Sequence, residues 1–155
     1  MASEVTVFVC FRDGTQGVSI EAAFAALKEA HSDWTIVKGG SVLSAGLYDQ
    51  APVKIYLNQR GTVEDEAREM AADAVRAGLD PETGARVAAA TSRFEVVWDT
   101  EKDEDPVPET ASVVIGAAQL LAKLTGGVPL INGHRPLDMK LDPDDLSAHD
   151  VLFPE

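Results

Sequence analysis

The chain has 155 residues, a length typical of a single domain that can bury a proper hydrophobic core. It carries 26 acidic residues against 13 lysines and arginines, and its net charge of -13 disfavours nucleic acids and anionic membranes as partners, because phosphate groups are bound by clustered cations. The single cysteine, Cys10, excludes an internal disulfide. The first residues lack the basic region that opens a signal peptide, so we expect a cytoplasmic protein.

The first third of the chain predicts strands and one helix. Alternating apolar residues over 4–11 indicate an interior strand that is apolar on both faces and therefore needs cover on each side. Ser19 is a suitable cap for the helix that follows. Strands are expected over 34–38 and 53–58, whereas the small residues of 41–46 leave that segment open, with a hairpin arm as one interpretation.

The middle of the chain predicts two helices and a strand. Thr62 is a suitable cap, and the acidic residues behind it favour a helix start, because the helix dipole stabilises anions there. Gly78 can end this helix. Asp80 followed by Pro81 is a second start signal, which predicts a short helix, and a strand is expected over 94–98.

The strongest helix signal covers 108–125 and is apolar around most of its circumference, so we expect this helix to be covered on more than one side. It is too short and too interrupted by polar residues to span a bilayer. Gly126 and Gly127 can end it. A short strand over 128–131 follows, in which Pro129 is expected at a sheet edge or a strand start.

This order of elements predicts an α+β fold with a ferredoxin-like split βαβ sheet, an additional C-terminal helix and a short strand. Helices are expected on one face of an open sheet, with the alternative that the C-terminal tail or the short helix covers the second face, because the first strand is apolar on both sides. We expect a single domain over residues 1–155, with its core in 4–131 and a C-terminal tail, 132–155, packed on the body.

The sequence contains few residues in patterns typical of catalytic, cofactor-binding or metal sites. The histidines, His31, His134 and His149, lie far apart and have no metal-ligand spacing, so no metal, cofactor or catalytic residue is predicted. The Gly-Thr-Gln-Gly turn at 14–17 could hold an anion before a helix, but it lacks the lysine of a P-loop, and an ordinary turn is the better interpretation. Cys10 fits a small buried hydrophobe better than a nucleophile. Whether the protein is an enzyme stays open, with a binding protein favoured.

Aromatic and acidic residues outside the predicted core suggest a contact surface. Tyr56 shares a strand face with polar neighbours, and Tyr48 lies in a turn-rich segment. The acidic connector contributes Asp103, Glu104 and Asp105. We therefore predict a partner-binding surface made of these five residues and a basic protein as the partner, with no role for nucleic acid or membrane. The oligomeric state is left open.

The run Leu121–His134 (LAKLTGGVPLINGH), together with RFEVVWD at 93–99, resembles a pattern in small bacterial families of ferredoxin-like proteins of unknown function. In that pattern a hydrophobic helix ends in T-G-G and leads into a short strand. Some of these proteins look like immunity proteins of polymorphic toxin systems. The resemblance covers the last third of the chain and implies a non-enzymatic protein, such as an immunity protein that neutralises a toxin by protein–protein contact. It carries over no functional residue.

An alternative hypothesis is a small-molecule-binding domain or enzyme of the ferredoxin-like class. Its pocket would lie near Trp34, Tyr48 and Trp98, since aromatic side chains commonly line ligand pockets. A third hypothesis assigns the acidity to solubility alone, in which case the carboxylates should be spread evenly over the surface.

Overall fold

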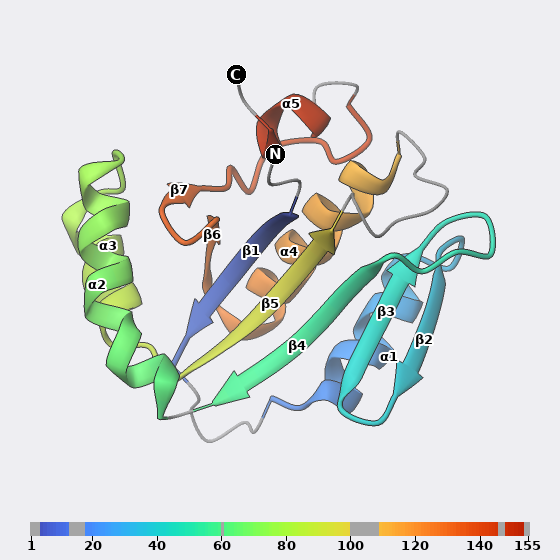
Figure 1. Ribbon diagram of the computed structural model, residues 1–155, viewed down its shortest axis with the longest axis horizontal. Helices are drawn as coiled ribbons and strands as arrows, with labels where there is room; N and C mark the ends of the chain where they lie inside the picture. Colours follow the sequence, from blue (N-terminus) through green and yellow to red (C-terminus); the bar gives the residue numbers. More distant parts are fainter. Residues whose placement is uncertain (1–3, 13–17, 60, 100–108, 146–147, 154–155) are drawn as a thin grey trace.

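The computed structural model describes residues 4–12, 18–59, 61–99, 109–145 and 148–153. Within these residues the chain forms a mixed α+β fold, with one seven-stranded antiparallel sheet and five helices (Figure 1). The strands are β1 (Glu4–Phe11), β2 (Thr35–Gly39), β3 (Val42–Gly46), β4 (Val53–Gln59), β5 (Ser92–Asp99), β6 (Val128–Ile131) and β7 (Arg135–Pro136). The helices are α1 (Ile20–Ala30), α2 (Thr62–Arg76), α3 (Pro81–Ala88), α4 (Thr110–Thr125) and α5 (Ala148–Leu152).

The strand order is β2-β3-β4-β5-β1-β6-β7, and every neighbouring pair is antiparallel. The ferredoxin-like split βαβ arrangement is not confirmed. A split βαβ unit leaves room for one strand between its two parallel strands, whereas three strands separate β1 from β2 here. The reason is the segment that the sequence left open: it forms β3, so β2, β3 and β4 make a meander and the sheet grows outward from β5.

One face of the sheet is covered by α1 and α4, which lie behind the strands in Figure 1. Val5, Val7 and Val9 of β1 point into this layer and are fully buried. The predicted central helix is confirmed as α4, and Leu121 at its inner side is fully buried as well. Gly126 ends α4 with a left-handed backbone (φ 70°), a conformation that glycine adopts without a steric penalty.

The second face is covered over β1 and β6 by the pair of helices α2 and α3. Phe8 and Cys10 of β1 and Leu130 of β6 pack there against the small side chains of α2, including Ala67 and Ala71. The expectation of helices on one face only is therefore wrong, whereas the alternative that the short helix covers the second face is confirmed by α3, which α2 joins there. The physical reason was visible in β1: with apolar residues on both sides of the strand, both faces needed cover.

Local signals decide where most elements begin. The Ser19 hydroxyl accepts a hydrogen bond from the N–H of Ala22 (3.1 Å), and the Asp80 carboxylate accepts one from Thr83 (2.9 Å), so both predicted caps are confirmed. Thr62 does not act as the cap. Gly61 takes that position instead, with a positive φ of 40° and no side-chain bond to the helix.

The C-terminal segment adds β7 and α5 to the sheet and its covered face. β6 is not the edge strand, because β7 pairs with it, and the carbonyl of Pro129 accepts the N–H of Leu137 (3.1 Å). The Arg135 guanidinium donates to the carbonyls of Val151 (2.9 Å) and Leu152 (3.2 Å), and the Leu152 side chain joins the core beside α4. None of the helices in the described part of the chain combines the length and the hydropathy that crossing a membrane requires.

Candidate functional site

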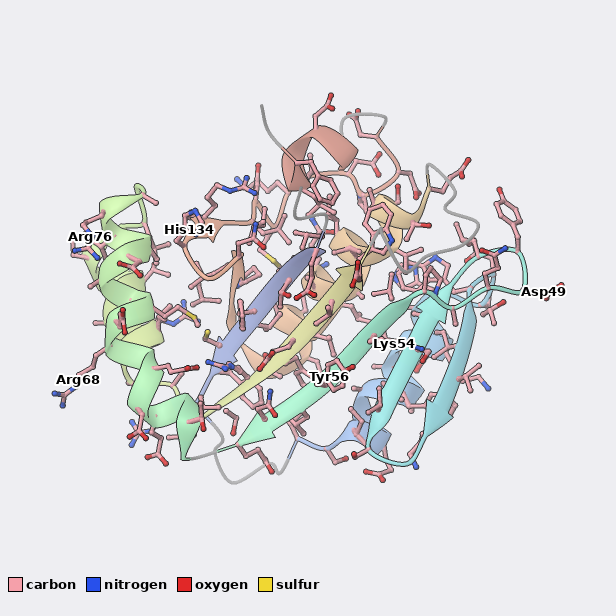
Figure 2. The ribbon with its side chains drawn as sticks, in the orientation of Figure 1. Asp49, Lys54, Tyr56, Arg68, Arg76 and His134 are labelled. Carbon is pink, nitrogen blue, oxygen red and sulfur yellow. The ribbon has the colours of Figure 1, made fainter. Side chains whose placement is uncertain are left out.

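The second face of the sheet is open beyond the α2–α3 pair. We call this surface the open face, and it is made of the outward side chains of β3, β4, β5 and the start of β1. Strand register places Ser44, Lys54, Val97 and Thr6 in one row across it. Tyr56 and Glu95 belong to the next row, which continues to Phe8 under the helices. Figure 2 shows Lys54 and Tyr56 on β4, on the side of the sheet that faces away from α1 and α4.

An arginine marks the border between the open face and α2. The guanidinium of Arg93 is bonded to the carboxylates of Glu66 on α2 (2.7 Å) and Glu95 on β5 (2.9 Å), and it lies 5.0 Å from the centre of the Phe8 ring. Burial alone would lower the pKa of Arg93, but the two carboxylates outweigh burial and raise that pKa. All of these contacts are internal, so Arg93 joins α2 to the sheet and does not serve as a free anion-binding group.

The main hollow of the open face has a volume of about 600 Å³. Its lining includes Glu4, Gln50, Lys54, Tyr56, Val97 and Asp99. Glu4 and Asp99 occupy directly opposed positions of β1 and β5, and both line the hollow. The Nζ of Lys54 donates to the Ser44 hydroxyl (2.8 Å), which holds the ammonium on the neighbouring strand.

The β3–β4 loop forms the rim of this hollow. It turns back so sharply that a Cβ on Gly46 would lie 2.1 Å from the carbonyl oxygen of Gln50. Glycine is therefore the residue that fits at this position. Tyr48 and Asp49 both have a positive φ, 56° and 65°, which is uncommon for residues other than glycine. The tight loop places Gln50 and the residues behind it against β4, where they form one wall of the hollow.

The structure distributes the predicted contact residues unevenly. Tyr56 lines the hollow and is 38% exposed. Tyr48 is 69% exposed but lies in the β3–β4 loop and does not line it. The predicted acidic residues Asp103, Glu104 and Asp105 lie outside the described residues.

Sequence reasoning missed the acidic pair and Lys54. Lys54 carried a usable signal, because its alternation with Tyr56 places both on the outer side of one strand. Nothing local could have paired Glu4 with Asp99, since the two residues come from opposite parts of the chain and meet only through the register of β1 and β5.

The aromatic residues of the alternative hypothesis contact different parts of the molecule. Trp34 stacks on His31 (3.7 Å between ring centres) and lies against Gly116 of α4. Trp98 is 3% exposed and contacts Phe153 edge-on in the core. Tyr48 points to solvent. None of these three aromatic residues lines a hollow found on the described part of the structure, so the alternative gains no support.

Burial shifts the pKa values of two side chains that could take part in catalysis, Cys10 and His31. Burial raises the pKa of the Cys10 thiol to about 12, and its sulfur lies 3.5 Å from the sulfur of Met70. Burial also lowers the pKa of His31, despite the nearby carboxylates of Asp33 and Asp144. The turn at 14–17 lies outside the described residues, and the residues that are described contain no cluster suited to a metal ion.

Comparison with known proteins gave no further guide to this surface: no family model, no curated protein and no solved structure matches the chain.

Proposed function

We propose that the protein is a non-enzymatic binding protein that holds a basic protein partner on the open face of its sheet. An immunity protein that neutralises a toxin by contact is the kind of protein we have in mind. The observation that carries the proposal is the pair of carboxylates, Glu4 and Asp99, in the lining of a hollow that also contains the exposed ring of Tyr56.

The acidic pair is an arrangement that favours a cation. Like charges directly opposite each other on neighbouring strands destabilise a sheet by roughly 0.2–1 kcal/mol. A lysine or arginine of a partner that enters the hollow would meet both carboxylates, Glu4 and Asp99. The ammonium of Lys54 would remain available to a carbonyl or carboxylate of the same partner, which would fix its orientation.

Tyr56 supplies the apolar part of the contact. Tyrosine is enriched at the centre of protein interfaces, because its ring offers a large rigid surface and its hydroxyl can still be hydrogen bonded. Its ring is half exposed on the open face and belongs to the same hollow as the carboxylates. A partner that covers this hollow therefore meets an aromatic surface and two anions together.

The net charge acts at longer range. A chain with a charge of -13 attracts a basic protein before contact, which speeds association and makes it depend on salt. We expect binding to weaken as the salt concentration rises, because the screening length shrinks to about 3 Å at 1 M salt.

The test is affinity capture from a lysate of the source organism with four versions of the protein. These are the wild type, Tyr56→Ala, Glu4→Lys and the control Glu29→Lys. Glu29 is exposed on α1, in the layer behind the sheet, so the control makes the same charge change away from the open face. We expect a basic protein to be captured by the wild type and Glu29→Lys, and to be lost with the other two.

The captured protein is then purified and titrated calorimetrically against each version at low and high salt. A binding constant that is at least about tenfold weaker for Tyr56→Ala and Glu4→Lys, and that falls with salt for the wild type, supports the proposal. Equal binding by all four versions, or an equal loss in the Glu29→Lys control, contradicts a role of the open face.

A further inference from the structure

A second hollow lies where β1 ends, between α3 and the turn that joins α4 to β6. Its volume is about 370 Å³, and it shares no lining residue with the hollow on the open face. Arg12, at the end of β1, and Arg86, in the last turn of α3, both line it. We call it the Arg12–Arg86 hollow.

The charge of this hollow is opposite to that of the protein as a whole. Acidic residues outnumber lysines and arginines by 26 to 13 in the chain, yet the described residues that line the hollow include two arginines and no carboxylate. Neither guanidinium forms an ion pair with a carboxylate of the described residues. Asp80 lies within electrostatic range of Arg86, but its carboxylate is bonded to Thr83 and does not line the hollow.

Arg86 is held in place by the protein itself. Its Nη2 donates to the carbonyl of Gly126, at the end of α4 (2.5 Å). This bond uses one donor and leaves the other N–H groups of the guanidinium for a ligand, since an arginine carries five donors. A guanidinium that is already oriented loses less conformational entropy when it binds an oxyanion than a free side chain would.

The floor and walls of the hollow are apolar. Ala85 and Ala89 on the α3 side line it with exposed side chains, and Val128 of β6 lies beside them. The Cys10 thiol also lines the hollow, and its pKa of about 12 keeps it neutral, so it adds no negative charge. Pockets that bind small molecules combine such apolar walls with a few polar groups, and their volumes begin at roughly 300 Å³.

We propose that the Arg12–Arg86 hollow binds a small organic anion. The two guanidinium groups hold its carboxylate or phosphate ester, and its apolar body lies against Ala85 and Ala89 on the α3 side. A bare inorganic ion would use the two arginines but would leave the apolar surface uncovered.

The experiment is an NMR titration of the ¹⁵N-labelled full chain at constant ionic strength. The probes are phenyl phosphate, benzoate, inorganic phosphate and the neutral benzyl alcohol. Each is added to the wild type, to Arg12→Gln, to Arg86→Gln and to the control Arg68→Gln. Figure 2 shows Arg68 on α2 pointing away from the sheet, and it does not line the hollow. The spectrum of each variant without ligand establishes that it is folded.

We expect phenyl phosphate, benzoate or both to cause saturable shifts at the amides of Arg12, Arg86 and Gly126. Each arginine substitution in the hollow should raise the dissociation constant about tenfold or more, because a hydrogen bond to a charged group is lost, and Arg68→Gln should change it less than about twofold. The tighter of the two organic anions identifies the ligand class as a phosphate ester or a carboxylate. Arg12→Gln leaves the Arg86–Gly126 bond in place and so tests the site even if Arg86→Gln is unfolded.

Three results would overturn the proposal. Shifts that never saturate, or that weaken equally in Arg68→Gln, mean that the anions respond only to the general charge. Benzyl alcohol that binds as tightly as the anions removes the role of the arginines. Inorganic phosphate that binds as tightly as phenyl phosphate removes the role of the apolar walls.

Discussion

The two faces of the sheet differ in the polarity and the burial of their side chains. On the face covered by α1 and α4, most inward residues of the central strands are buried and apolar, and Val7, Ile55 and Val96 are fully buried. On the open face, the residues next to these in sequence are Lys54, Tyr56 and Glu95, which alternate with them along β4 and β5. The covered face therefore carries the stability of the fold, whereas the open face can vary in chemistry at little cost to the fold.

The largest effect should come from the covered face. Leu121→Ala removes a fully buried side chain from the inner side of α4 and should lower the free energy of unfolding by roughly 2–5 kcal/mol, because it leaves a cavity in a layer that cannot collapse around it. Urea unfolding followed by circular dichroism measures the change.

Leu124→Ala is the matched control for this substitution. Leu124 belongs to the same helix but is 37% exposed, so its truncation should cost less than about 1 kcal/mol. Equal losses for the two variants would mean that α4 is not held against the sheet by its inner side.

The sequence predicted the helices well because their signals are local. Apolar periodicity found α4, and the caps Ser19 and Asp80 located the starts of α1 and α3. Thr62 is not the cap because the helix already includes it as its first residue, and Gly61 with a positive φ precedes it. Such signals depend on a few neighbouring residues, so they survive whatever the strand order is.

The strand order and the candidate site were harder, because both depend on pairing between distant segments. The small residues of β3, Ser44, Ala45 and Gly46, gave little alternation, and without β3 the sheet could not be assembled in the right order. The open face followed from that order. Tyr56 was predicted to be exposed, but its neighbours Glu4 and Asp99 became visible only once β5 was placed between β4 and β1.

Loss of the contact between Arg93 and α2 should have an intermediate effect on stability. Arg93→Met removes the cation shared by Glu66 and Glu95 and should lower the free energy of unfolding by about 1–3 kcal/mol. The loss stays below that of a fully buried ion pair, because the Glu66 side chain is 49% exposed and water can solvate it after the change. Thermal or urea unfolding measures it.

Lys54→Met is the control, since it removes a cation from the same face. Lys54 is bonded to a serine hydroxyl on an exposed part of the sheet, so its loss should change stability by less than about 0.5 kcal/mol. A cost for Arg93→Met no larger than that of Lys54→Met would show that Arg93 does not join α2 to the sheet.

The smallest effect should have the opposite sign. Glu4→Gln removes the repulsion between two opposed carboxylates and should raise the free energy of unfolding by roughly 0.2–1 kcal/mol in the isolated protein. Glu29→Gln on α1 makes the same change in net charge without touching this pair, so the difference between the two variants isolates the local repulsion from the general effect of a charge of -13. Residues that serve binding commonly reduce the stability of the protein. If Glu4→Gln raised the free energy of unfolding and weakened partner binding, the two measurements together would show this trade-off between stability and function directly. No gain over Glu29→Gln would mean that Lys54 or solvent already balances the pair, and the hollow would then hold no stored repulsion between the two carboxylates.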